Sequence, residues 1–355
     1  MRAAHKKLWL LGIALAVAAA AVVFISANGS TQRLGCYDIQ LDAAERTARC
    51  FEAIRSYRTE LGMELAPEDV RKTGMIGEEF TDITTSVGSV ESKRTAADPD
   101  MSALFVRMLT EAGLKAGDRV GAGFSGSFPS LNIALICACD AMGIDITYIS
   151  SIGASFYGAN HPDLTFPDMA HRLYLDGLIS TDSTLVTPGG DYDNGKGVFD
   201  EEAFIPIIAR IKDYGIPVMR EENYQQNLAN RRAVYDEAEI DCFVAVGGNI
   251  SSTGLDESAL SLGQGLLKQN IPVGGLNKHS GLVQYYLAQG LPVINMLNLR
   301  QIVADYSMPF DPPVQLAPGE SPAYWTVSYP KLPIAAAFTA VFAILIARKR
   351  IIKKK

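Results

Sequence analysis

The sequence predicts an α/β fold: a mostly parallel, doubly wound sheet in one extracytoplasmic domain, flanked by an N-terminal and a C-terminal transmembrane helix. Three observations predict it. A long uncharged apolar run lies near each end of the chain, and between these runs short apolar segments alternate with segments of helical spacing. Small polar residues follow most of the short apolar segments, as turns do where buried strands end. The predicted parts are residues 1–27, a domain at 28–331, and residues 332–355.

The first apolar run, Leu8–Ala27, is long enough to cross a bilayer. Arg2, Lys6 and Lys7 precede it. A cleaved signal peptide is the alternative, but its apolar region would be shorter, and no clear small-x-small cleavage site follows this run. The sequence therefore favours an uncleaved anchor.

The second apolar run, Leu332–Ala347, is shorter and is apolar all round. Six basic residues follow it: Arg348, Lys349, Arg350, Lys353, Lys354 and Lys355. Tyr324, Trp325 and Tyr329 precede it, where aromatic rings would mark a membrane interface. A terminal core helix is the alternative. The basic flanks predict that both termini are cytoplasmic and that the domain between them lies outside.

The charge of the chain is concentrated at its ends. Nine of the 32 Lys and Arg and none of the 39 Asp and Glu lie in the two tails, which leaves 23 basic and 39 acidic residues, a formal charge of −16. An acidic domain disfavours nucleic acid as a partner. The two apolar runs are expected to be surrounded by membrane lipid.

Helices and strands alternate through most of the domain, after a polar stretch at 81–95 that the pattern does not assign. Helices are predicted over 42–61, 101–112 and 127–142, and strands over 119–124, 144–150, 184–187, 217–219, 242–246, 271–273 and 291–295.

Five cysteines do not form a disulfide framework in a domain of this size. Cys137, Cys139 and Cys242 are predicted core residues. Cys36 and Cys50 could pair in an oxidising compartment, and this pairing stays open.

Small polar residues at the predicted strand ends are the candidate ligand-binding set, because ligands of open α/β sheets bind beyond the carboxyl ends of the strands. The set is Ser125, Gly126, Ser127, Ser151, Gly248, Asn249, Gly275, Asn277 and Lys278. Their backbone N–H groups would receive an anion, and the Lys278–His279 pair would add positive charge before a helix starting near Gly281. The alternative is that glycine and serine are simply good turn formers.

Ser125 is a candidate nucleophile, but the local pattern does not favour this role. The segment Gly123–Ser127 lacks the last glycine of the nucleophile-elbow pattern, although a strand precedes it and a helix follows. Ser127 also fits a helix N-cap with Pro129 in the first turn. We therefore expect an anion-binding turn here, with pure capping as the next alternative.

The sequence assigns no catalytic residue, and the candidates are Ser125, Ser127, His161 and His279. His171 also follows the serines in the chain, and Asp168 or Asp176 could orient a histidine. His161 is better explained as a loop residue bonded to backbone.

No metal or cofactor is expected. The acidic loop Gly189–Gly197 lacks the ligand spacing of an EF-hand. No phosphate-binding loop and no complete dinucleotide fingerprint occur.

One set of motifs resembles the poly-gamma-glutamate system proteins of bacteria. The motifs are Thr73–Phe80, Ile83–Thr85, Gly88–Ser89, Lys93–Thr95, Gly123–Pro129, Ser150–Ser155, Gly158–Asn160 and Val246–Asn249. The resemblance implies a setting in the inner membrane of a bacterial cell, with the membrane synthase subunits as partners and the glutamate polymer itself as a further candidate partner. It carries over no catalytic residue, because the ATP-dependent ligase of such systems is a different protein.

The expected function is that of a membrane-anchored accessory protein of poly-gamma-glutamate synthesis or export, which binds the polymer end or the synthase through strand-end loops. One alternative is an extracytoplasmic serine hydrolase or transferase that acts on the polymer. The other is a purely structural subunit of the synthase.

Overall fold

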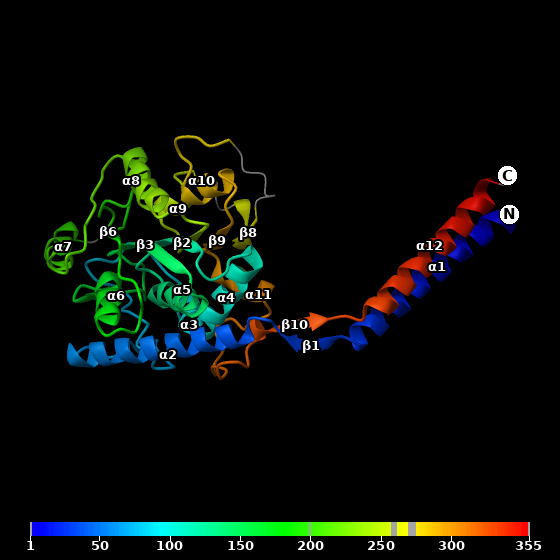
Figure 1. Cartoon of the computed structure of the whole chain (residues 1–355), viewed down its shortest axis with the longest axis horizontal. Helices are drawn as coiled ribbons and strands as arrows, with labels where there is room; N and C mark the ends of the chain where they lie inside the picture. The colour runs from blue at the N-terminus through cyan, green and yellow to red at the C-terminus, as the bar shows by residue number, and fades with distance from the viewer. Residues whose placement is uncertain (1, 199, 257–260, 269–274, 354–355) are drawn as a thin grey trace. The chain divides into compact units, whose positions relative to one another are not determined.

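The structure is a computed structural model that describes residues 2–198, 200–256, 261–268 and 275–353. It divides into two compact units (Figure 1). One unit is Cys36–Tyr324, and the other joins the two ends of the chain, up to Gly35 and from Trp325 onward. The boundaries lie inside those predicted at 28 and 331.

The terminal unit is a helical hairpin continued by a two-stranded ribbon. Helices α1 (Arg2–Ala27) and α12 (Lys331–Lys353) run side by side in opposite directions, so the two termini lie at the same end (Figure 1). Strands β1 (Ser30–Arg33) and β10 (Trp325–Ser328) pair antiparallel at the other end.

The two helices pack through residues at alternating spacings of three and four, as in a coiled coil. The residues less exposed than their neighbours include Leu10, Ala14, Val17 and Ala21 of α1 and Ile334, Ala337, Val341 and Ile344 of α12. Large apolar side chains point away from the contact, among them Trp9 and Phe338, which are 71% and 75% exposed. By length and composition, both helices could cross a membrane.

The larger unit is built on a six-stranded sheet. Its spatial order is β6-β3-β2-β7-β9-β8, and all neighbours are parallel except the pair β8–β9. The strands are β2 (Arg119–Phe124), β3 (Asp145–Ser151), β6 (Leu185–Thr187), β7 (Cys242–Val246), β8 (Gly265–Leu267) and β9 (Val293–Met296). Successive strands add on one side of β2 as far as β6, and the chain then returns to the other side of β2 with β7.

Ten α-helices are described in this unit: α2 (Tyr37–Glu60), α3 (Val90–Ala96), α4 (Asp100–Ala112), α5 (Pro129–Met142), α6 (Phe166–Leu175), α7 (Phe204–Asp213), α8 (Tyr224–Glu237), α9 (Ile250–Thr253), α10 (Leu282–Ala288) and α11 (Leu299–Asp305). A small hairpin, β4 (Asn160–His161) and β5 (Leu164–Thr165), precedes α6.

The alternation of side chains along β2 explains how helices cover both faces of the sheet. Phe124 points to one face, where its ring centroid lies 4.9 Å from that of Tyr148. Gly121 points to the other, where an added Cβ would lie 2.7 Å from Ile240 and 2.9 Å from Tyr235 of α8. Glycine at this position therefore allows α8 to approach the sheet, and the Tyr235 hydroxyl donates to the carbonyl of Ala122 at 2.7 Å.

The cysteines of the larger unit are free thiols. Cys137, Cys139 and Cys242 are fully buried, as predicted. Cys50 does not pair with Cys36; its sulfur lies 3.7 Å from that of Cys137, where α2 packs on α5.

The predicted α/β fold with a mostly parallel sheet is confirmed. The predicted strand 217–219 contributes only a bridge between Val186 and Val218, and the predicted strand 271–273 lies outside the described residues. Strand β8 was not expected. The interfacial placement of Tyr324 is wrong: its side chain is fully buried, and its hydroxyl donates to Asp100 Oδ1 at 2.5 Å.

Candidate functional site

The carboxyl ends of β2, β3 and β7 meet at one edge of the sheet, as the sequence predicts. The Gly126 N–H donates to Ser151 Oγ at 3.1 Å, and the Ser125 N–H donates to the carbonyl of Val246 at 3.2 Å. Gly247, with φ +83°, packs so closely on Ser125 that an added Cβ would lie 2.9 Å from the Ser125 Cβ. The structure thus gathers the turn 125–127, Ser151 and the segment 247–249.

The amide groups of the turn are already bonded within the protein. Besides the bond from Gly126, the Ser127 N–H donates to Ser125 Oγ at 3.2 Å, and the Phe128 N–H donates to the Ser125 carbonyl at 3.3 Å. Ser125 itself is only 7% exposed. An anion could use these N–H groups only by displacing the hydroxyl or carbonyl oxygens that they already bind, so the turn does not present free N–H groups to an anion.

Ser127 is not the N-cap of α5. Phe128 holds that position without a side-chain hydrogen bond, while Pro129 occupies the first turn as expected. The Ser127 hydroxyl instead accepts a hydrogen bond from the backbone N–H of Ser155 at 2.9 Å. The capping prediction fails because the loop after β3 approaches this hydroxyl.

A buried lysine, Lys93 of α3, completes this cluster. Its Nζ lies 2.9 Å from Ser155 Oγ, donates to the Ser127 carbonyl, and stands 3.8 Å from the ring centroid of Phe128. Lys93 is 3% exposed, and among the described residues no carboxylate lies within 4.0 Å of it. Burial lowers the pKa of Lys93 to about 7. Lys93, Ser127 and Ser155 are called the Lys93 cluster below.

A lysine with this pKa is about half neutral at pH 7, and a neutral amine has one lone pair. The lone pair can accept the hydroxyl proton of Ser155 while Lys93 still donates to Ser127. The arrangement therefore has the elements of a serine nucleophile with a lysine base.

Close packing covers the Lys93 cluster. An added Cβ at Gly88 would lie 2.9 Å from Ser155 Oγ, and one at Gly158 would lie 2.9 Å from the Ser127 Cα. Ser155 is 6% exposed in consequence. A substrate would reach Ser155 only if the neighbouring loop at Gly88 moved.

The candidate histidines lie elsewhere. His161 lies in β4 and not in a loop, but its Nδ1 accepts from the Asp163 N–H at 3.2 Å, so the expected bond to backbone is present. His279 is exposed, and its N–H donates to Asn277 Oδ1 at 2.6 Å. In the part of the chain that the structure describes, no hydrogen bond joins a histidine to Ser125 or Ser127.

The two aspartates that were expected to orient a histidine have other partners. Asp168 accepts two hydrogen bonds from Arg210, both at 2.8 Å, and Asp176 accepts one from the Tyr57 hydroxyl at 2.5 Å. The partner of His171 is Asp182, at 2.6 Å.

Gly275, Asn277 and Lys278 lie on an exposed loop that is bound to α8 and to the end of α9. The Asn277 N–H donates to Ser280 Oγ at 3.1 Å, and the Lys278 carbonyl accepts from Gln225. Within the described ranges, no hydrogen bond links this loop to the turn at Ser125.

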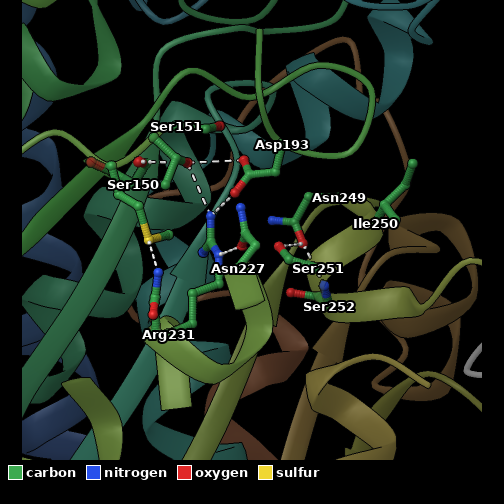
Figure 2. A network of polar contacts seen from close by, with 12 residues as sticks. Ser150, Ser151, Asp193, Asn227, Arg231, Asn249, Ile250, Ser251 and Ser252 are labelled. Carbon is green, nitrogen blue, oxygen red and sulfur yellow. Dashed lines mark hydrogen bonds and ion pairs between the residues drawn. The ribbon is translucent and has the colours of Figure 1, made fainter. Parts of the chain in front are cut away.

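A buried ion pair near the same sheet edge was not predicted from the sequence. Arg231 of α8 pairs with Asp193, and it also donates to Thr187 Oγ1 at 3.0 Å and to Asn227 Oδ1 at 2.9 Å (Figure 2). Thr187 in turn donates to Asp193 Oδ1 at 2.9 Å. The pair joins the acidic loop 189–197 to α8. No cluster of metal-ligating side chains occurs among the described residues, in this loop or elsewhere.

No protein-family model matches this chain, and no curated protein matches it. The likeness to poly-gamma-glutamate system proteins therefore stays a prediction.

The sequence around Lys93 did not predict that this lysine is buried beside two serines. It lies in the polar segment that the hydrophobic pattern does not assign, and only the motif Lys93–Thr95 of the resemblance includes it. Its burial depends on Ser155 and Phe128, which are far from it in the sequence.

Proposed function

We propose that this chain is a membrane-anchored accessory protein of poly-gamma-glutamate synthesis or export in the bacterial inner membrane. The observation that carries the proposal is the α1–α12 hairpin: its helices contact each other through small and branched residues and direct large apolar side chains outward. Such a surface is costly in water and favourable in lipid. The polymer enters the proposal through the motif resemblance alone.

The doubly wound domain would then carry the recognition function outside the membrane. Its charge of −16 repels an anionic polymer at long range, so any contact with the polymer must be local. The strand order reverses between β2 and β7, and this is where ligands of doubly wound folds bind. Gly248, which is exposed at that edge, supports contact with the polymer end or with a synthase subunit.

Two neighbouring positions of α1 test the proposal. Ala14 is 6% exposed, and Leu15 beside it is 73% exposed. Ala14→Trp should separate the helices and reduce both co-purification with the membrane synthase and polymer yield, whereas Leu15→Trp should leave both unchanged. Release of the wild-type protein from membranes by alkaline carbonate would rule out the anchor.

The contact between Lys93 and Ser155 favours a second candidate function, acyl transfer. Ser155 Oγ would attack an amide carbonyl carbon while its proton passes to Lys93 Nζ. Lys93 would then protonate the leaving nitrogen as the C–N bond breaks. Water or an amine would take the acyl group from Ser155, which regains its proton.

A fluorophosphonate probe distinguishes the two candidates. If Ser155 is a nucleophile, labelling should rise with pH through about 7 and disappear in Ser155→Ala but not in the control Ser125→Ala. Absence of labelling over the whole pH range would leave the accessory role alone.

A further inference from the structure

A cleft of about 560 Å³ opens at the end of α2, and none of the residues that line it belongs to the Lys93 cluster. Its walls are Arg58, the segment 61–68, Glu78, Glu79, His161 and Asp163. Its volume lies within the range of small-molecule sites. The segment 61–68 contributes aliphatic side chains, including Leu61, Met63 and Leu65.

Arg58 is a buried cation without an ion-pair partner among the described residues. It is 3% exposed, and its Nε is enclosed with no acceptor. Among the described residues, its guanidinium makes no hydrogen bond and has no carboxylate within 4.0 Å. Burial lowers the pKa of Arg58, although Asp69 and Glu78 oppose this from longer range.

The nearby carboxylate of Asp69 is occupied. It accepts from the N–H and the hydroxyl of Thr73, both at 3.0 Å, and from the N–H of Gly74 at 2.7 Å. The favourable dipole at the end of α2 compensates Arg58 only in part. An unpaired buried charge is strongly unfavourable. Since the described residues supply no partner for Arg58, a group from outside the chain would have to relieve this cost.

The rim of the cleft has the opposite charge. Glu64, Glu78, Glu79 and Asp163 are exposed around it. These carboxylates do not form a metal site, since no group of three metal-ligating side chains occurs in the described ranges. A ligand that satisfies both parts has a carboxylate at Arg58 and a cationic group facing the rim.

We propose that this cleft binds a small aliphatic α-amino acid, with its carboxylate on Arg58, its ammonium group toward Glu78 and its side chain on the aliphatic wall. Arg58 suits this role because a guanidinium binds a carboxylate through two parallel hydrogen bonds. Glu78 is the rim carboxylate whose charge acts on Arg58. An acidic side chain would be repelled by the rim, so aliphatic amino acids are preferred over glutamate. The proposal depends on neither of the functions proposed above.

Isothermal titration of the full-length protein in detergent tests the proposal with three matched probes. L-Leucine has both charged groups, 4-methylpentanoate lacks the ammonium group, and 3-methylbutylamine lacks the carboxylate. We expect L-leucine to bind at least tenfold more tightly than either analogue, and L-glutamate to bind more weakly than L-leucine.

Variants separate recognition from folding. Arg58→Met should abolish leucine binding without lowering the melting temperature, since it removes an unpaired buried charge. Arg55→Met, one turn earlier on an exposed pair with Glu52, is the matched control and should bind leucine normally. Glu78→Gln should make leucine and 4-methylpentanoate bind about equally.

Three results would overturn the proposal: unchanged leucine binding by Arg58→Met, equal binding of 3-methylbutylamine and leucine by the wild type, or no binding of leucine at all. A large fall in melting temperature in Arg58→Met would also count against it, because it would show that Arg58 is stabilised by the protein itself.

Discussion

Lys93 Nζ lies 2.9 Å from Ser155 Oγ, and Lys93 has no carboxylate within ion-pair distance among the described residues. Among the described residues, the groups that contact this ammonium are uncharged: a hydroxyl, a carbonyl and the ring of Phe128. The cation of Arg231 in the same unit has Asp193 as its partner. The two buried cations should therefore respond differently to pH and to substitution.

Lys93 makes stability depend on pH. Its pKa is about 7 in the folded chain and has an ordinary value of 10.5. Between these values the unfolded chain binds the extra proton, so stability rises with pH, by up to roughly 1.4 kcal/mol per unit. Urea denaturation should show the wild type gaining about 2 kcal/mol over Lys93→Met between pH 7 and pH 9. A constant difference between the two proteins would contradict the lowered pKa.

Arg231→Met should be strongly destabilising, because it leaves the carboxylate of Asp193 buried without its cation. We expect a loss of about 3–5 kcal/mol in urea denaturation, with partial recovery in Arg231→Met/Asp193→Asn. Arg55→Met, which breaks an exposed pair, should cost less than about 1 kcal/mol. Equal costs at both sites would show that Arg231 is hydrated in solution.

Asp100 has the opposite effect on stability. Burial raises its pKa to about 6, and the folded chain then binds a proton between 3.8 and 6 that the unfolded chain lacks. Stability from this group is greatest below pH 3.8 and is lost as pH rises through 6. Asp100→Asn should therefore be more stable than the wild type at pH 7.5 by about 1–3 kcal/mol and no more stable at pH 4. Asp145→Asn, at an exposed position, should show no such difference.

The topology of the chain can be tested with a single background variant. Four of the five cysteines are buried, so Cys36→Ser should not react with a membrane-impermeant maleimide. In that background Val87→Cys, at a position 81% exposed, should be labelled in intact spheroplasts, whereas Lys349→Cys should be labelled only after lysis. Labelling of Lys349→Cys from outside would contradict cytoplasmic termini.

The central strands were predictable because they are short segments made mostly of apolar and small residues. The predicted bounds of β2 and β7 match the structure, since residues 119–124 and 242–246 are bounded by turn residues. Strand β8 was missed because three residues, Gly265–Leu267, carry no periodicity, and their pairing with β9 is set by tertiary contact.

The candidate site was predictable only as a location. The predicted strand ends correctly placed Ser125, Gly126 and Ser151 close together. Whether their N–H groups are free to bind a ligand depends on loops from other parts of the chain, which supply the acceptors. The burial of Arg58 could have been predicted, because Arg58 follows Phe51 and Ile54 at helical spacing and so lies on the buried face of α2. No pattern of neighbours could show that it lacks a partner.

The ribbon of β1 and β10 holds the two chain segments that lead into the larger unit next to each other, from Ser30 beside Ser328 to Arg33 beside Trp325. Along the sequence, the larger unit is thus an insertion between the two halves of the hairpin. A single proteolytic cut in one of its surface loops would leave each fragment with its own helix, α1 or α12. If α1 and α12 anchor the chain in a membrane as proposed, release of the larger unit would require two cuts, one on each strand of the ribbon or beyond it.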